Sequence, residues 1–127
     1  MKKHQPQVLV VEDDLMLLET LREGITRRGL KVLTARDGQE GLEVAEQAKP
    51  DIILLDLLMP RMDGMTMLEK MRTTDWGKDM PVIVLTNVNE TAKIADSIRH
   101  HAFDYLIKSD WKIKDVIQKI QDRLALS

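Results

Sequence analysis

Five short apolar runs alternate along the chain with longer segments in which apolar residues recur at helical spacing. Short apolar runs are typical of buried strands, and apolar residues three or four positions apart are typical of a helix packed on one side. Strict alternation of the two predicts a parallel sheet with helices on both faces and right-handed crossovers. The expected strands are residues 8–11, 31–34, 51–56, 81–86 and 103–107.

The segments between these runs carry signals for the ends of helices. Gly29 follows the last turn of the first segment, which is the usual place for the residue that ends a helix. Residues 37–40 have the sequence of a capping box and open the second helix, and Asn89 can cap the fourth. Apolar residues that mark the first, third and fourth helices are Leu15, Leu18, Leu21, Ile25, Met65, Leu68, Met71, Ala92, Ala95 and Ile98. The side chains expected to face inward in the second and last helices are Leu42, Ala45, Ile113, Val116, Ile117, Ile120 and Leu124.

The length and the charge balance of the chain restrict its function to a local site. With 127 residues there is room for one domain and one core, which we expect to occupy about residues 7–125 without a separate output domain. The hydrophobic fraction of 43% and the charged fraction of 31% are typical of a soluble globular protein. Lys and Arg total 19 against 21 Asp and Glu, so no excess of positive charge favours direct binding of nucleic acid.

The chain has no cysteine, which excludes disulfides, thiolate nucleophiles and cysteine-ligated zinc. The apolar run that follows the basic residues near the N-terminus stops at Glu12 and is too short for a secretory leader. No stretch approaches the roughly 18 apolar residues of a membrane span. We therefore expect a cytoplasmic protein that does not enter a membrane.

Polar side chains stand where the predicted strands end. Glu12 and Asp13 follow the first strand, Asp56 ends the third, Thr86 ends the fourth and Lys108 follows the fifth. In open α/β sheets ligands bind beyond the carboxyl ends of the strands, and these five side chains would converge there if the strand order were 2-1-3-4-5. Three adjacent carboxylates are costly unless a hard cation neutralises them, and Mg²⁺ prefers oxygen ligands. The sequence therefore predicts a magnesium site at this edge.

A carboxylate beside a bound cation can act as a nucleophile toward phosphorus and form an acyl phosphate. Asp56 has the central position for this role, Lys108 can neutralise the transferred group, and the Thr86 hydroxyl can bond one of its oxygens. Each residue also has an ordinary structural role, because an Asp after a strand usually caps a helix, as we expect of Asp14. The functional hypothesis rests on all five residues meeting at one edge.

Four ordered motifs over almost the whole chain resemble the receiver domains of two-component response regulators. They are VLVVEDD at residues 8–14, PDIILLDLLMPRMDG at 50–64, PVIVLT at 81–86 and DYLIK at 104–108. The resemblance implies a flavodoxin-like fold of five βα units, a doubly wound five-stranded parallel sheet in the order 2-1-3-4-5. It also implies Mg²⁺-dependent phosphoryl transfer to Asp56 from a sensor histidine kinase or a histidine phosphotransfer protein.

The resemblance assigns a role to each site residue. Asp13 would bind the metal directly and Glu12 through water, while Asp56 and the backbone carbonyl of Leu58 would complete the protein ligands. Lys108 would bind the phosphoryl group. Thr86 and Tyr105, which we expect side by side in register, would rearrange together on phosphorylation.

The same resemblance implies a switched surface for a downstream protein target, formed by the helix after Asn89, the strand at 103–107 and the last helix. The protein would be a monomer or a phosphorylation-dependent homodimer without direct contact to nucleic acid. It would not be an enzyme beyond catalysing its own phosphorylation and dephosphorylation. Two positions depart from the family pattern, since Ser109 stands where proline is common and His101 where a small residue is common.

Three other functions remain to be distinguished. A phosphotransferase of the haloacid dehalogenase type carries a second Asp two residues after its nucleophile, and Leu58 occupies that place here. A flavin-binding electron carrier needs a phosphate loop after the first strand, where Glu12 and the two following aspartates would repel phosphate. A degenerate receiver that only binds partners would lack part of the set of Asp13, Asp56, Thr86 and Lys108, so a phosphorylation assay separates it from an active receiver.

Overall fold

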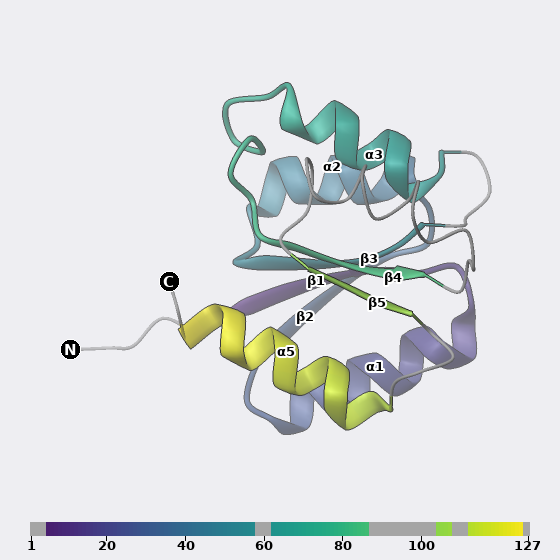
Figure 1. The fold of residues 1–127 in the computed structure, drawn as a ribbon, viewed down its shortest axis with the longest axis vertical. Coiled ribbons are helices and arrows are strands. Elements are labelled where there is room, and N and C mark those ends of the chain that lie inside the picture. The colour runs from purple at the N-terminus through teal and green to yellow at the C-terminus, as the bar shows by residue number, and fades with distance from the viewer. Residues whose placement is uncertain (1–4, 58–61, 87–103, 108–111, 126–127) are drawn as a thin grey trace.

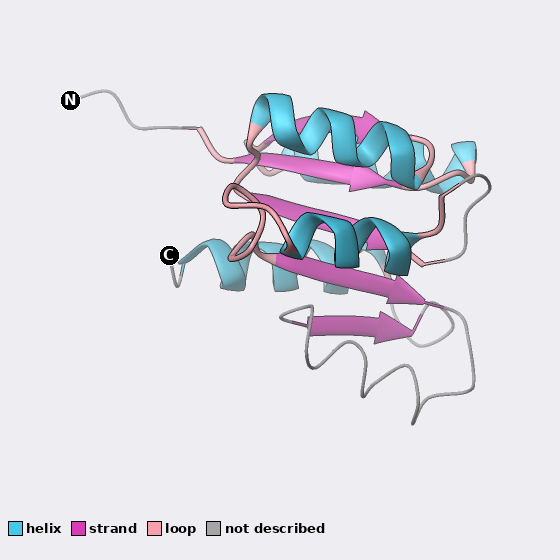
Figure 2. Ribbon diagram, turned by 90° about the horizontal axis from the view of Figure 1, so that it is seen from above, coloured by secondary structure: helices cyan, strands magenta, loops and turns pink. Residues whose placement is uncertain are grey.

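A five-stranded parallel sheet forms the centre of the molecule in a computed structural model, which describes residues 5–57, 62–86, 104–107 and 112–125 (Figure 1). The strand order is β2-β1-β3-β4-β5, as predicted, and all neighbouring strands run in the same direction (Figure 2). The strands are β1 (Gln7–Val11), β2 (Lys31–Ala35), β3 (Ile52–Asp56), β4 (Val82–Thr86) and β5 (Asp104–Ile107).

Helices cover both faces of this sheet, which confirms the doubly wound arrangement for the described part of the chain. The helices α1 (Leu15–Arg27) and α5 (Ile113–Ala125) lie on one face, and α2 (Gly38–Ala48) and α3 (Gly64–Arg72) lie on the other (Figure 1). The helix predicted after Asn89 lies outside the described residues. No helix within the described ranges is long and apolar enough to cross a membrane.

Two buried layers of side chains, one on each face, hold the sheet between its helices. In β3, Ile53 and Leu55 belong to the layer under α2 and α3, and Ile52 and Leu54 belong to the layer under α1 and α5. Successive side chains of a strand point to opposite faces, so a strand covered on both sides must be apolar throughout. This requirement explains the uninterrupted apolar run that precedes Asp56.

The buried face of α1 includes three of the four residues at the predicted helical spacing. Leu18, Leu21 and Ile25 are buried as expected, whereas Leu15 is 53% exposed. The apolar stripe that packs against the core begins at Leu17 and Leu18, so Leu15 lies in the first turn, ahead of the part of α1 that packs on the sheet. Leu15 thus shares the predicted helical spacing of the other three residues but not their burial.

The predicted helix ends are confirmed for α1 and α2. Gly29 follows α1 with a φ of 85°, a left-handed conformation that glycine adopts without steric cost. The Asp37 carboxylate accepts a hydrogen bond from the amide of Glu40 at 2.9 Å, which caps α2. Glu40 in turn accepts from the amide of Arg36 at 2.6 Å, one residue before the cap. The capping box thus fixes both sides of the turn into α2.

Two glycines in helices touch very different neighbours. The amide of Gly38, at the start of α2, donates to the carbonyl oxygen of Met62 at 2.8 Å, and a β-carbon at Gly38 would overlap that oxygen. A β-carbon at Gly24, in α1, would lie 2.8 Å from Cδ1 of Ile117 in α5. The first neighbour is backbone and cannot move away, whereas the second is the end of a flexible side chain.

We therefore expect opposite effects when each glycine is replaced by alanine. Gly38→Ala should lower the free energy of unfolding by about 1–3 kcal/mol, because it forces α2 away from the backbone before α3. Gly24→Ala should change it by less than about 1 kcal/mol, since better helix propensity offsets a small shift of Ile117. Urea unfolding followed by circular dichroism measures both, and equal stabilities of the two variants would contradict the close backbone contact.

Candidate functional site

Three carboxylates meet at the carboxyl ends of β1 and β3. Glu12, Asp13 and Asp56 each place one carboxylate oxygen within 4.8 Å of the other two. Parallel pairing of β1 with β3 aligns Val11 with Leu55 and so brings the ends of the two strands together. The sequence predicted convergence of five side chains for the strand order 2-1-3-4-5, and the structure confirms it for these three.

The burial of this carboxylate cluster makes its negative charge costly. Glu12 is only 1% exposed and Asp56 3%, while Asp13 is accessible to solvent. Like charges at this separation repel, and removal from water strengthens the repulsion. A bound hard cation would relieve that cost, because all three groups offer oxygen ligands.

The spacing of the carboxylate oxygens is compatible with one small divalent cation. Oxygen ligands at about 2.1 Å from Mg²⁺ lie at most about 4.2 Å from one another. The oxygens of Glu12, Asp13 and Asp56 need only a small adjustment from their limit of 4.8 Å, or an intervening water for one of them. The donor set and the spacing therefore fit a magnesium site.

The turn between β1 and α1 fixes Glu12 and Asp13 from both sides. The amide of Glu12 donates to the carbonyl of Ala35 at 2.9 Å, which continues the pairing of β1 with β2 by one residue. Asp14 caps α1, as predicted, because its carboxylate accepts from the amides of Met16 and Leu17 at 3.0 and 3.3 Å. The amide of Asp14 also donates to the Glu12 carboxylate at 3.1 Å.

Asp56 is the last residue of β3, and the backbone around it is fixed by α3. The amide of Leu57 donates to the carbonyl of Leu85 at 3.2 Å, and the carbonyl of Leu57 accepts from the amide of Gly64 at 3.0 Å. A β-carbon at Gly64 would overlap the carbonyl oxygen of Asp56. The helix α3, capped by Asp63 through the amide of Thr66 at 2.8 Å, therefore begins directly against the end of β3.

The close contacts of Gly38 and Gly64 were not predicted from the sequence. In both cases an Asp caps a helix and a Gly occupies the first helical position, in the pairs Asp37–Gly38 and Asp63–Gly64. Glycine is unfavourable inside a helix. A glycine directly after the N-cap in two helices is therefore a sequence signal for a backbone contact that leaves no space for a side chain.

Strands β4 and β5 end at the same edge as the carboxylate cluster. Pairing of β3 with β4 aligns Asp56 with Leu85, so Thr86 lies one position beyond Asp56 on the neighbouring strand. Thr86 pairs with Ile107, which precedes Lys108 in the sequence. Tyr105 pairs with Val84 and not with Thr86, so the predicted register was wrong by two residues.

The remaining predicted site positions, Leu58 and Lys108, lie outside the described residues, as do the two departures from the family pattern at His101 and Ser109. The structure thus brings together Glu12, Asp13 and Asp56 and places the backbone of Thr86 next to them.

Comparison with known proteins agrees with this architecture. Residues 8–121 match the family described as the response regulator receiver domain. The transcriptional regulatory protein AfsQ1 of Streptomyces coelicolor is 34% identical over 103 residues, which are 81% of this chain and 44% of that protein. The chain spans about half the length of the curated relatives that it matches.

Solved structures share the fold over almost the whole chain. The receiver domain of the Francisella response regulator 1452 has a TM-score of 0.87 at 26% identity and covers 95% of this chain and 98% of its own. The chemotaxis protein CheY4 of Vibrio cholerae has a TM-score of 0.84 at 26% identity and covers 94% and 98%, respectively. The fold is therefore the flavodoxin-like α/β fold of CheY, and the chain belongs to the response regulator receiver domain family of two-component signalling.

Proposed function

We propose that this receiver domain accepts a phosphoryl group on Asp56 in a Mg²⁺-dependent reaction with a sensor histidine kinase or a histidine phosphotransfer protein. The observation that carries the proposal is the convergence of Glu12, Asp13 and Asp56 at one edge of the sheet, two of them buried. A buried carboxylate beside two others is costly for the fold, so its presence indicates a role in binding or chemistry.

In the proposed reaction a carboxylate oxygen of Asp56 attacks the phosphorus of a phosphohistidine. The bond from phosphorus to the imidazole nitrogen breaks, its electron pair stays on that nitrogen, and an acyl phosphate forms on Asp56. Bound Mg²⁺ supplies neutralisation of the negative charge on the transferred oxygens. The fixed backbone at Leu57 and Gly64 holds the nucleophile in place for attack in line with the departing nitrogen.

The residues that would hold the metal are Asp13 and Asp56 directly, the backbone carbonyl of Leu58, and Glu12 through water. Lys108 and Thr86 would bind phosphoryl oxygens. Because Asp56 is 3% exposed and Asp13 is accessible, we propose that the phosphoryl group enters from the side of Asp13.

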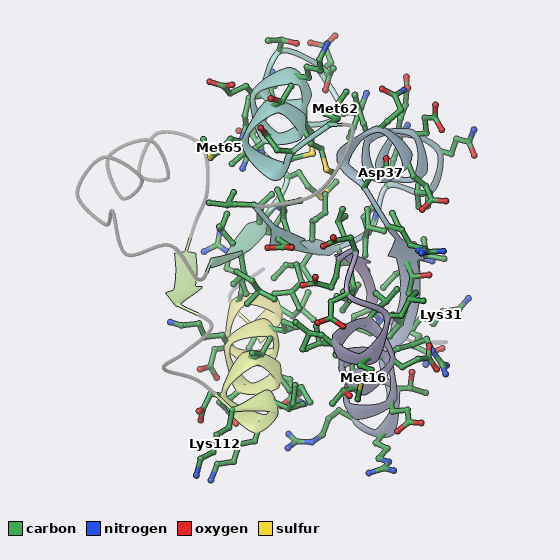
Figure 3. All side chains as sticks on the ribbon, turned by 90° about the vertical axis from the view of Figure 1, so that its right-hand side faces the viewer. Met16, Lys31, Asp37, Met62, Met65 and Lys112 are labelled. Carbon is green, nitrogen blue, oxygen red and sulfur yellow. The ribbon has the colours of Figure 1, made fainter. Side chains whose placement is uncertain are left out.

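A surface for the phosphodonor lies next to this entrance. Met16 is 83% exposed and Leu15 53%, both in the first turn of α1 directly after the cap Asp14 (Figure 3 labels Met16). Adjacent exposed apolar side chains can be covered by a protein partner at low desolvation cost. We propose that the kinase or phosphotransfer protein covers this turn during transfer.

The proposed output is a change of the surface formed by β5, α5 and the helix predicted after Asn89. Phosphorylation would draw Thr86 toward the phosphoryl group and Tyr105 would follow, which is a packing change biased by a new charge. The target would be a protein, with a monomer or a phosphorylation-dependent homodimer as the acting form and no direct contact to nucleic acid. We place this single domain of residues 1–127 in the cytoplasm, where the family acts, and propose no catalysis beyond its own phosphorylation and dephosphorylation.

Acetyl phosphate and Mg²⁺ should label Asp56 and no other residue. Intact mass and peptide mapping are expected to show one phosphoryl group on the wild type and none on Asp56→Asn, because the neutral amide is not a nucleophile. Asp75→Asn, which changes an exposed carboxylate in the loop after α3, is the matched control and should label normally. Equal labelling of Asp56→Asn, or labelling that survives a chelator, would contradict the assignment.

Magnesium should reverse the stability order of the wild type and Asp13→Asn. Without metal the variant should be at least as stable, since one of three repelling charges is gone. At about ten times its Kd, Mg²⁺ should stabilise the wild type by about 1.4 kcal/mol and the variant far less. Thermal unfolding of both proteins in EDTA and in Mg²⁺ at matched ionic strength shows which of them is more stable in each condition. Equal stabilisation of the two proteins by Mg²⁺ would argue against the site.

Beryllofluoride with Mg²⁺, which mimics the phosphoryl group, should change the amide NMR signals of β5 and of the first turn of α5. The reason is the proposed coupling of Thr86 to Tyr105 across the pairing of β4 with β5. Asp56→Asn provides the control and should show no change at these residues. Changes confined to Asp13, Asp56 and their immediate neighbours would rule out the proposed output surface.

A further inference from the structure

We propose that Asp14 is a positioning residue of the magnesium site, because its backbone amide holds the buried Glu12 carboxylate in place. This inference rests on the proposed function, since it assigns a further residue to the same metal site. The amide nitrogen of Asp14 lies 3.1 Å from Oε2 of Glu12.

Glu12 needs such a donor because its side chain is 1% exposed. A buried carboxylate without hydrogen bonds is strongly destabilising, and a glutamate has several rotatable bonds through which its oxygens can move away from a bound ion. A hydrogen bond to Oε2 restricts those rotations. Groups that orient the carboxylates around a metal commonly determine its affinity.

The direction of the Asp14 amide is itself fixed by α1. The carboxylate of Asp14 accepts from the amides of Met16 and Leu17, and its carbonyl accepts from the amide of Leu18 at 2.9 Å. Asp14 has a φ of −76° and a ψ of 109°, the extended backbone of an N-cap. The carboxylate and the carbonyl oxygen of Asp14 are bound to α1, which fixes its backbone, and in this position its amide donates to Glu12.

A backbone amide has an advantage over a charged donor at this place. A lysine or arginine bound to Oε2 would add a positive charge and oppose a cation at the same carboxylate cluster. The neutral amide orients Glu12 and leaves its negative charge available to Mg²⁺. The cap thus connects the start of α1 to the metal site without changing the net charge of the site.

Three neutral substitutions separate the cap from the amide. Asp14→Asn keeps both an oxygen acceptor for the cap and the amide, Asp14→Ala keeps only the amide, and Asp14→Pro keeps neither. The φ of −76° at Asp14 is within the range of proline, so the ring fits the backbone there. Because the three variants have equal charge, differences between them do not arise from the charge of residue 14.

The affinity for Mg²⁺ is measured by titration, with the amide NMR signal of Leu57 as the reporter next to Asp56. We expect Asp14→Pro to bind Mg²⁺ about tenfold more weakly than Asp14→Ala, and Asp14→Asn to bind most tightly of the three. Thermal unfolding in EDTA should give a lower melting temperature for the proline variant than for the alanine variant, since proline also removes the hydrogen bond to the buried Glu12 carboxylate. Equal Mg²⁺ affinities of these two variants, within about twofold, would overturn the inference.

The same comparison in a Glu12→Ala background tests whether the amide acts through Glu12. The difference between Asp14→Pro and Asp14→Ala should vanish there, because the bonding partner is gone. A difference that persists would overturn the proposed route. A merely structural contribution of Asp14 would remain in both backgrounds.

A measurement on the wild type keeps the test decisive if the proline variant does not fold. The amide proton of Asp14 should shift during the Mg²⁺ titration with the same midpoint as the signal of Leu57, and it should not shift in Glu12→Ala. A constant Asp14 signal while Leu57 responds would overturn this inference alone. Failure of the wild type to bind Mg²⁺ at all would instead overturn the proposed function, and this inference with it.

Discussion

The parallel pairing of β1 with β3 is the constraint on which the site depends. It aligns Val11 with Leu55, so the residues that follow these two positions, Glu12 and Asp56, lie next to each other. The pairing is stabilised by apolar side chains on both faces of β3, so the energy that holds the carboxylates together comes from the two core layers under the helices. The carboxylates of Glu12, Asp13 and Asp56 contribute no such stabilisation to one another, because like charges this close repel.

This division between an apolar core and an edge of like charges is compatible with the switching function that we propose. A site that is electrostatically unfavourable without a ligand gains much from binding a cation, and the gain is available to shift an equilibrium between two packings. The surrounding hydrogen bonds prevent the repulsion between the carboxylates from distorting the sheet. The cap of α1 at Asp14, the bond from Glu12 to Ala35 and the bond from Gly64 to Leu57 all fix backbone, so the repulsion cannot be relieved by moving the strands apart.

Much of the fold and part of the site could be predicted from the sequence, because period and burial are properties of single segments. The strands and the cap at Asp14 follow from such local patterns, whereas the carboxylate cluster also required the strand order that the family resemblance implied. The exposure of Leu15 could not be predicted, since helical spacing says which residues share a face but not how far a helix extends past its sheet. The register of Tyr105 with Val84 could not be predicted from alternation, because a shift of two residues leaves every side chain of a strand on the same face.

The contact of Gly38 with Met62 and that of Gly64 with Asp56 have a consequence for the mobility of the molecule. The short segment before α3 lies between the start of α2 and the end of β3, and at both contacts backbone meets backbone with no space for a β-carbon (Figure 3 labels Met62 and Asp37). Neither helix can therefore change its tilt at this end while the other keeps its own. A displacement of the backbone at Asp56 would therefore be transmitted to the start of α3 and, through Met62 and Asp63, to the start of α2.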